Sequence, residues 1–240
     1  MKIGSLFSGI GGLEMGLEAC GLGPVAWQCD IDPESRAALA EHWPNAKRYD
    51  DVRAIDEKAE RVDIICGGFP CQPINLAGKQ KGKADTRWLW PFFADIIRRL
   101  RPSAVFVENV PALRTSGLRD VLADLARLGF DARWDCFSSC EVGAAHSRRR
   151  LFLLAHADSI DGQIRLGSRS QPGPQTPGDR GESGAVPALR VASWCPIPLM
   201  ADGLPRRLAR LPGNAVDPRV AELAFRELSG RFGERGRFCA

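Results

Sequence analysis

The stretch Cys66–Asn75 constrains the fold of this chain more than any other. It follows Val62–Ile65, a largely apolar, β-branched run that is typical of a strand buried in a parallel sheet. Two glycines and two prolines then end the strand and fix a loop. Open α/β sheets bind ligands at the carboxyl ends of their strands, so Cys71 in this loop is a candidate nucleophile. A small buried cysteine is the alternative, and the loop alone does not decide between them.

The N-terminal segment predicts a strand, a glycine-rich turn and a helix in succession. Residues 2–7 form the strand, residues 8–12 the turn, and Leu13–Cys20 the helix, which Gly21 ends. Such a unit resembles a cradle for a nucleotide cofactor, because glycines allow close approach and the helix offers free N–H groups. A tight turn that needs glycine for steric reasons alone is the alternative.

Acidic residues follow the next two predicted strands. Pro24–Cys29 reads as a strand that ends at Asp30, roughly twenty positions beyond the glycine turn, where dinucleotide folds place a carboxylate on ribose hydroxyls. Asp32 is predicted to cap a helix that runs to about His42. Asp51 is a second acidic candidate near a strand end. Capping or turn formation is the alternative role for both Asp30 and Asp51.

A further apolar run, Ala104–Val107, predicts a buried strand that places Glu108 at the same edge as the cysteine loop. Burying an unpaired charge is costly, so packing does not explain a carboxylate there. The stretch Glu141–Arg150 is predicted to be a loop that carries Arg148 and Arg150, with a solvated basic turn as the alternative. The other predicted elements are helices over Trp88–Leu100, Gly117–Leu128 and Asp217–Leu228 and strands over Phe130–Ser138 and Leu151–Leu154.

Composition narrows the class of protein. A chain of 240 residues fits one large α/β domain, and a formal charge of +4 permits a nucleic-acid partner without requiring one. Eight cysteines without a signal peptide indicate a reducing compartment. Cys136 and Cys140 lack a second pair at ligand spacing, so no metal site is expected. No apolar run is long enough to span a membrane, and a soluble cytoplasmic protein is predicted.

The composition changes sharply at Asp158, after which glycine, proline, serine, glutamine and arginine dominate to about Val186. This is typical of a linker or loosely folded insertion. We therefore expect a cofactor-binding and catalytic domain over residues 1–156, a short variable segment or linker over 157–203, and a C-terminal part over 204–240 that returns to the first domain.

Five blocks, in their order along the chain, resemble the motifs of DNA (cytosine-5) methyltransferases, particularly the compact phage-like members. The resemblance implies an α/β fold, a Rossmann-like class I methyltransferase sheet with helices on both faces, and makes 157–203 a very short target-recognition insertion. Gly68–Gln72 together with Glu108–Val110 is the specific part of the signal, and the other blocks support it. Those other blocks are Ser5–Gly12, His146–Arg150 and Gly213–Val216.

The resemblance also implies a mechanism. Cys71 would attack C6 of a cytosine that has left the duplex stack, and Glu108 would bind N3 and supply a proton. Arg150 would grip the base, and Arg148 would order the catalytic loop. S-adenosylmethionine would be the cofactor. The residues implied in binding it are Phe7 against the adenine, Gly9 and Gly11 at the turn, Asp30 on the ribose, Asp51 on the adenine amine, Pro70, and Asn214 from the C-terminal side.

Departures from the family pattern leave alternatives open. Asp30 stands where the family usually has glutamate, and the recognition segment is very short and poor in aromatic residues. Methylation of cytosine in tRNA by the same chemistry is one alternative, and a non-catalytic homologue that binds DNA or cofactor is another. The leading hypothesis is a monomeric enzyme that acts on double-stranded DNA, with a restriction endonuclease as partner and a target of only a few base pairs.

Overall fold

The structure is a computed structural model, which describes residues 1–70, 88–157 and 215–233. These segments belong to one compact unit. Cys71, Asn214 and the predicted recognition segment lie outside the described residues, so the structure says nothing about them. Within the described ranges, no helix is both long and apolar enough to cross a membrane.

A seven-stranded sheet forms the centre of the unit, in the order β3-β2-β1-β4-β5-β7-β6. The five strands from β1 to β5 run parallel, whereas β7 lies antiparallel between β5 and β6. This arrangement confirms the predicted Rossmann-like α/β class. The strands are β1 Ile3–Leu6, β2 Val25–Cys29, β3 Lys47–Tyr49, β4 Ile64–Gly67, β5 Ala104–Asn109, β6 Phe130–Ser138 and β7 Arg149–Ala157.

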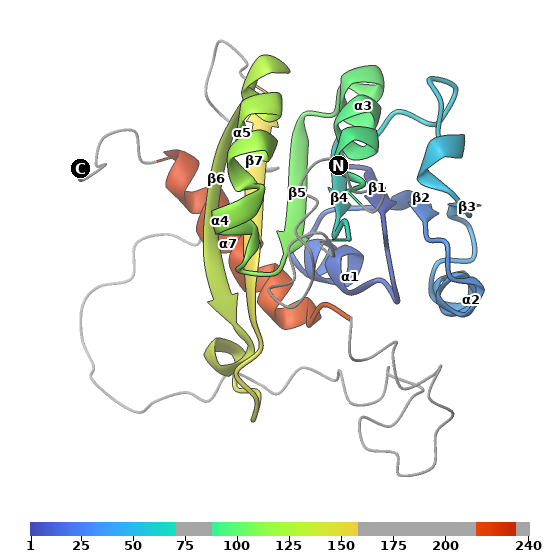
Figure 1. The fold of residues 1–240 in the computed structure, drawn as a ribbon. Helices are drawn as coiled ribbons and strands as arrows, with labels where there is room; N and C mark the ends of the chain where they lie inside the picture. The colour runs from blue at the N-terminus through green and yellow to red at the C-terminus, as the bar shows by residue number, and fades with distance from the viewer. Residues whose placement is uncertain (71–87, 158–214, 234–240) are drawn as a thin grey trace, which may run out of the picture. The chain divides into compact units, whose positions relative to one another are not determined.

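Helices cover both faces of the sheet (Figure 1). The apolar sides of α3, α4 and α5 enter one buried cluster with the sheet, and those of α1, α2 and α7 enter another on the opposite side. The helices are α1 Gly12–Ala19, α2 Pro33–His42, α3 Trp90–Leu100, α4 Leu113–Ser116, α5 Leu118–Arg127 and α7 Pro218–Gly233, with short 3-10 turns η1 Val52–Ala54 and η4 Ser139–Val142.

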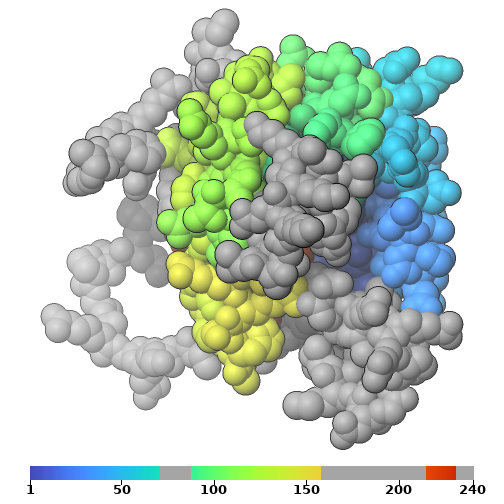
Figure 2. All heavy atoms as spheres, viewed as in Figure 1, coloured from blue at the N-terminus to red at the C-terminus, as the bar shows by residue number. Residues whose placement is uncertain are grey.

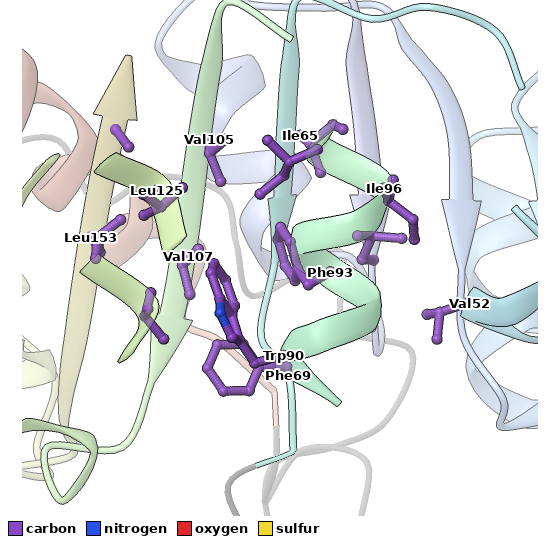
Figure 3. Close-up of a cluster of buried hydrophobic side chains, with 14 of the residues drawn as sticks. Val52, Ile65, Phe69, Trp90, Phe93, Ile96, Val105, Val107, Leu125 and Leu153 are labelled. Carbon is purple, nitrogen blue, oxygen red and sulfur yellow. The ribbon is translucent and has the colours of Figure 1, made fainter. Parts of the chain in front are cut away.

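Aromatic residues concentrate in the first cluster, where α3 meets the sheet (Figure 3). Trp90 and Phe93 are fully buried in α3, and their ring centroids lie 5.4 Å apart. Phe69, from the loop after β4, packs on both rings. Burial of such large apolar side chains contributes roughly 1.5–3 kcal/mol each, so this cluster anchors the chain just before the cysteine loop.

The C-terminal helix α7 packs closely on α1 because glycines let the two approach. A Cβ at Gly16 would stand 2.6 Å from Ala221 Cβ and 2.7 Å from the carbonyl oxygen of Pro218. A Cβ at Gly12 would overlap the carbonyl oxygen of Val216. Any larger residue would therefore push α7 away from the start of α1.

Most predicted elements occur within two residues of their expected bounds, and Asp32 caps α2 as predicted, accepting from the backbone N–H of Glu34. One prediction is wrong. Arg149 and Arg150 were expected in a loop, but they begin β7, which extends well beyond the predicted Leu151–Leu154. Pairing with β5 and β6 on both sides overrides the polar local sequence.

Candidate active site

The carboxyl ends of the five parallel strands gather the candidate residues along one edge of the sheet. Phe7 directly follows β1, Asp30 directly follows β2, and Glu108 is the next-to-last residue of β5. The described surface in Figure 2 runs from the blue of the first sixty residues to the green and yellow of the segment through β7. Phe7 and Asp30 thus follow the neighbouring strands β1 and β2, whereas Glu108 lies on β5 and Arg150 on β7.

Glu108 and Arg150 form an ion pair at this edge. Arg150 Nε lies 3.0 Å from Glu108 Oε1, and only 12% of the Glu108 side chain is exposed. The antiparallel register explains the meeting, since Glu108 pairs with Phe152 and Asn109 with Leu151 at the start of β7. The chain direction thus brings the first residues of β7 to the last residues of β5.

Burial raises the pKa of Glu108 to about 7, whereas the positive charges of Arg150 and Arg148 oppose this rise. The pKa of Arg148 is lowered, first by burial and then by the charge of Arg150. A carboxyl group with a pKa near neutrality can hold or release a proton under ordinary conditions. The three residues therefore form a group that can bind a polar ligand edge and exchange one proton with it.

The loop after β4 is fixed directly beside Glu108. A Cβ at Gly68 would stand 2.9 Å from Glu108 Oε2, so a larger residue here would make the Glu108 carboxyl group shift. The Nδ2 group of Asn109 donates to the carbonyl oxygen of Phe69 at 3.0 Å, and Asn109 is 3% exposed. The β4–β5 ladder stops at Gly67, so the Asn109 side chain extends the connection by two residues.

Phe69 is held from its ring side as well. Its centroid lies 5.3 Å from Trp88 and 5.4 Å from Trp90, within reach of edge-to-face and tilted aromatic contacts. Pro70 follows, half-buried, and is the last described residue before Cys71. The sequence reading gave no role to Asn109 or Phe69, although a polar residue directly after a buried strand is the signal that marks Asn109.

The glycine turn after β1 has residues in the left-handed region. Phe7 has a φ of 55°, Gly9 of 56° and Gly11 of 89°. A Cβ at Gly9 would meet no atom within 4 Å, whereas one at Gly11 would overlap the ring of Trp43. Packing on Trp43 thus requires Gly11, and the open space lies over Gly9.

The two acidic candidates already accept hydrogen bonds from the chain. Asp30 Oδ2 accepts from Gly9 N at 2.7 Å and Oδ1 from Asp32 N at 2.9 Å. Burial raises the pKa of Asp30, and these N–H donors oppose the rise. Asp51 caps η1 and pairs with Arg53 at 2.6 Å, and the hydrogen bonds from Arg53 lower its pKa. The capping alternative therefore describes Asp51 in this structure.

The described residues contain no group of three or more His, Cys, Asp or Glu side chains that could hold a metal ion. Cys140, which was considered for such a site, is exposed, and its thiol donates to the carbonyl oxygen of His146.

A family model described as C-5 cytosine-specific DNA methylase matches residues 1–180 of this chain. Among curated proteins, the Type II methyltransferase M.NgoBI of Neisseria gonorrhoeae is 34% identical over 161 residues, which cover 65% of this chain and 50% of that protein. The Type II methyltransferase M.NgoBV of the same organism is 30% identical over 193 residues, covering 73% and 45%. The chain thus spans about half the length of the curated relatives it matches.

Solved structures share the fold. A DNMT2 variant of Spodoptera frugiperda superposes with a TM-score of 0.57 at 24% identity, covering 75% of this chain and 56% of that one. A putative DNA modification methyltransferase encoded within an E. coli prophage has a TM-score of 0.56 at 26% identity, covering 68% and 49%.

Proposed function

The chain belongs to the family of C-5 cytosine-specific DNA methylases, and from this premise we propose that it methylates C5 of cytosine in double-stranded DNA. One observation carries the proposal from the family to this chain. Glu108, with a pKa of about 7, is paired with Arg150 and lies against the loop that leads into Cys71. The acid and the nucleophile-bearing loop thus converge at one edge of the sheet.

The reaction needs a nucleophile and an acid together because cytosine C5 is unreactive in the aromatic ring. The Cys71 thiolate forms a bond to C6 of a flipped base, and the electrons of the C5–C6 double bond move toward C5 and N3. A proton from Glu108 to N3 prevents negative charge from building on the ring. After C5 has gained its methyl group and lost its proton to a base, the bond to Cys71 breaks, the ring recovers its double bond, and the N3 proton returns to Glu108.

The arginines serve the base and the acid. Arg150 donates from Nε to Glu108, and its remaining N–H groups suit the O2 acceptor of cytosine. Arg148, half-buried beside the same pair, adds positive charge where electron density gathers on the ring. Loss of either arginine removes a charge that opposes the raised pKa of Glu108.

The glycine turn fits the cofactor S-adenosylmethionine, because the space over Gly9 is open and Ile31, which follows Asp30, is an apolar side chain with 76% exposure. Phe7, Gly9, Gly11, Asp30, Asp51, Pro70 and Asn214 are the residues that we assign to holding it. When bound, the cofactor supplies the methyl group for cytosine C5. Asp30, whose oxygens already accept two backbone N–H groups, orders the turn and has acceptor capacity left for a hydroxyl.

DNA is the proposed substrate because the matching family model is one of DNA methylases, and a restriction endonuclease partner is a further part of the proposal. We propose that the chain acts as a monomer on a short target. The likeness to DNMT2, at 24% identity, supports the fold alone, so tRNA is an alternative substrate that the experiment must include.

A covalent trap tests this proposal. The full chain with S-adenosylmethionine should form a denaturation-resistant complex with DNA that contains 5-fluorocytosine, because fluorine at C5 blocks the final elimination. Cys71→Ala should abolish the complex, whereas Cys140→Ala, which removes an exposed thiol elsewhere, should trap as the wild type does. A fluorocytosine-containing tRNA forms the parallel arm. Trapping by Cys71→Ala would exclude Cys71 as the nucleophile, and trapping of tRNA alone would reassign the substrate.

A further inference from the structure

A buried polar pair lies beneath the glycine turn, away from the catalytic candidates. Glu14, in the first turn of α1, and Gln28, in β2, are both 0% exposed. Gln28 Nε2 donates to Glu14 Oε1 at 3.1 Å. A fully buried carboxylate without a cation beside it is costly, so this pair needs a physical explanation.

The unpaired atoms of the two groups supply that explanation. Glu14 Oε2 and Gln28 Oε1 are buried, and neither has a hydrogen-bond partner in the part of the chain that the structure describes. Gln28 Oε1 is an acceptor in every state and lacks a donor, whereas the hydroxyls of Ser5 and Ser8 are the donors near an ionised Glu14. A single proton on Glu14 Oε2 would turn this oxygen into the donor that Gln28 Oε1 lacks. The carboxylic acid and the amide would then form two antiparallel hydrogen bonds in a ring.

We propose that Glu14 is a neutral carboxylic acid in the folded protein, and that its cyclic pair with Gln28 positions the glycine turn. The groups around it agree with this assignment. Ser5 from β1 and Ser8 from the turn present hydroxyls to Glu14, and burial raises the pKa of Glu14 against their effect. Cys66 of β4 is the titratable group that faces it, and burial raises the pKa of this thiol well above its ordinary value. From α7, Ala221 and the Pro218 main chain approach α1 at Gly16.

The pair is the innermost of three consecutive connections between the end of β2 and the turn. Gln28 holds Glu14, the Cys29 carbonyl oxygen accepts from Ser8 N at 3.0 Å, and Asp30 accepts from Gly9 N at 2.7 Å. Glu14 is therefore a positioning residue, which acts through the turn rather than on a ligand. Its effect on cofactor affinity rests on the proposed function, whereas its protonation does not.

Two substitutions separate the protonated pair from a simple structural role. Glu14→Gln provides an N–H donor in place of the acid O–H, so the ring of two hydrogen bonds survives. Glu14→Leu fills the space but leaves Gln28 without either partner. Glu227→Gln, on the exposed side of α7, is the matched control.

Infrared spectra of the full chain near pH 7 measure the proton directly. The wild type should show a carboxylic-acid C=O band that is lost in Glu14→Gln and retained in Glu227→Gln. Amide hydrogen exchange at residues 8–11 should be unchanged in Glu14→Gln and about tenfold or more faster in Glu14→Leu, since one buried hydrogen-bonded partner is worth about that factor. Affinity for S-adenosylhomocysteine should be unchanged in Glu14→Gln and lower in Glu14→Leu.

Each measurement tests one part of the proposal. If Glu14→Gln loses no acid band, Glu14 is ionised and the proposal is overturned. If Glu14→Gln and Glu14→Leu speed exchange equally, the acid–amide ring does not hold the turn. If the wild type binds no S-adenosylhomocysteine, the proposed function fails, while the infrared and exchange results still decide the role of Glu14.

Discussion

Replacing Glu108 with glutamine should make the protein more stable at pH 8 than the wild type, while its activity collapses. Burial raises the pKa of Glu108 from 4.5 to about 7, so the folded chain keeps a proton that the unfolded chain has lost between these values. Unfolding in this window releases a proton, and wild-type stability therefore falls as the pH rises. The same difference in pKa corresponds to about 3 kcal/mol.

Glutamine resembles the protonated acid and does not titrate. Below pH 4.5, where Glu108 is neutral in both states, the variant and the wild type should unfold with similar free energies. The advantage of Glu108→Gln should then grow to about 3 kcal/mol by pH 8. Other buried acids, Glu14 and Asp30 among them, also have raised pKa values, but they titrate in both proteins and cancel in the comparison.

Urea unfolding of both proteins from pH 4 to pH 8, with equal m-values as the criterion for comparison, measures this difference. Glu227→Gln, a Glu-to-Gln change at an exposed position, serves as the control. A stability advantage for the wild type that increases with pH would mean that Arg150 keeps Glu108 ionised, and the assignment of Glu108 as a neutral-pH acid would then be wrong. Methyl transfer by Glu108→Gln should fall by roughly 10²–10⁴-fold.

Three further predictions concern packing, the nucleophile loop and recognition. Gly16→Ala should destabilise the protein by about 1–3 kcal/mol, because the new Cβ would lie 2.6 Å from Ala221 Cβ. Gly230→Ala, with open space around it in α7, should stabilise the protein by about 0.5–1 kcal/mol. Thermal unfolding measures both variants, and a change in stability of the same sign in both would refute the packing argument. Asn109→Leu should slow trapping on fluorocytosine DNA about tenfold, whereas the core variant Leu125→Ala should lower stability by about 2–5 kcal/mol without slowing it. Bisulfite sequencing of a methylated random duplex should reveal a target of a few base pairs, with binding that weakens steeply with salt; a long, strictly required site would contradict this.

The sequence was sufficient for β1, β2, β4 and β5 because these strands are short, largely apolar runs, whereas β3, Lys47–Tyr49, has no such run. The sequence also placed Glu108 correctly at a strand end, because packing alone does not explain a charged residue there. It did not show that Arg150 belongs to a strand. That placement depends on β5 and β6, which pair with β7 from both sides and lie far away in the chain.

Local patterns also did not distinguish between two uses of the same residue type. Gly9 and Gly11 look alike in sequence, but only the structure shows that Trp43 occupies the space beside Gly11. Asp51 is predicted as a ligand residue at a strand end, and the structure shows a second use, since it caps η1 and pairs with Arg53. Such choices depend on the neighbours that folding brings in, and no window of sequence contains them.

The position of β7 determines when, during folding, the ion pair between Glu108 and Arg150 can form. The edge strand β6 pairs only with β7 in the described sheet, and β7 in turn pairs with β5. Until β7 docks on β5, Glu108 is an ordinary solvated acid, and Arg150 does not lie beside it. The raised pKa and the ion pair therefore arise in the same step that completes the sheet.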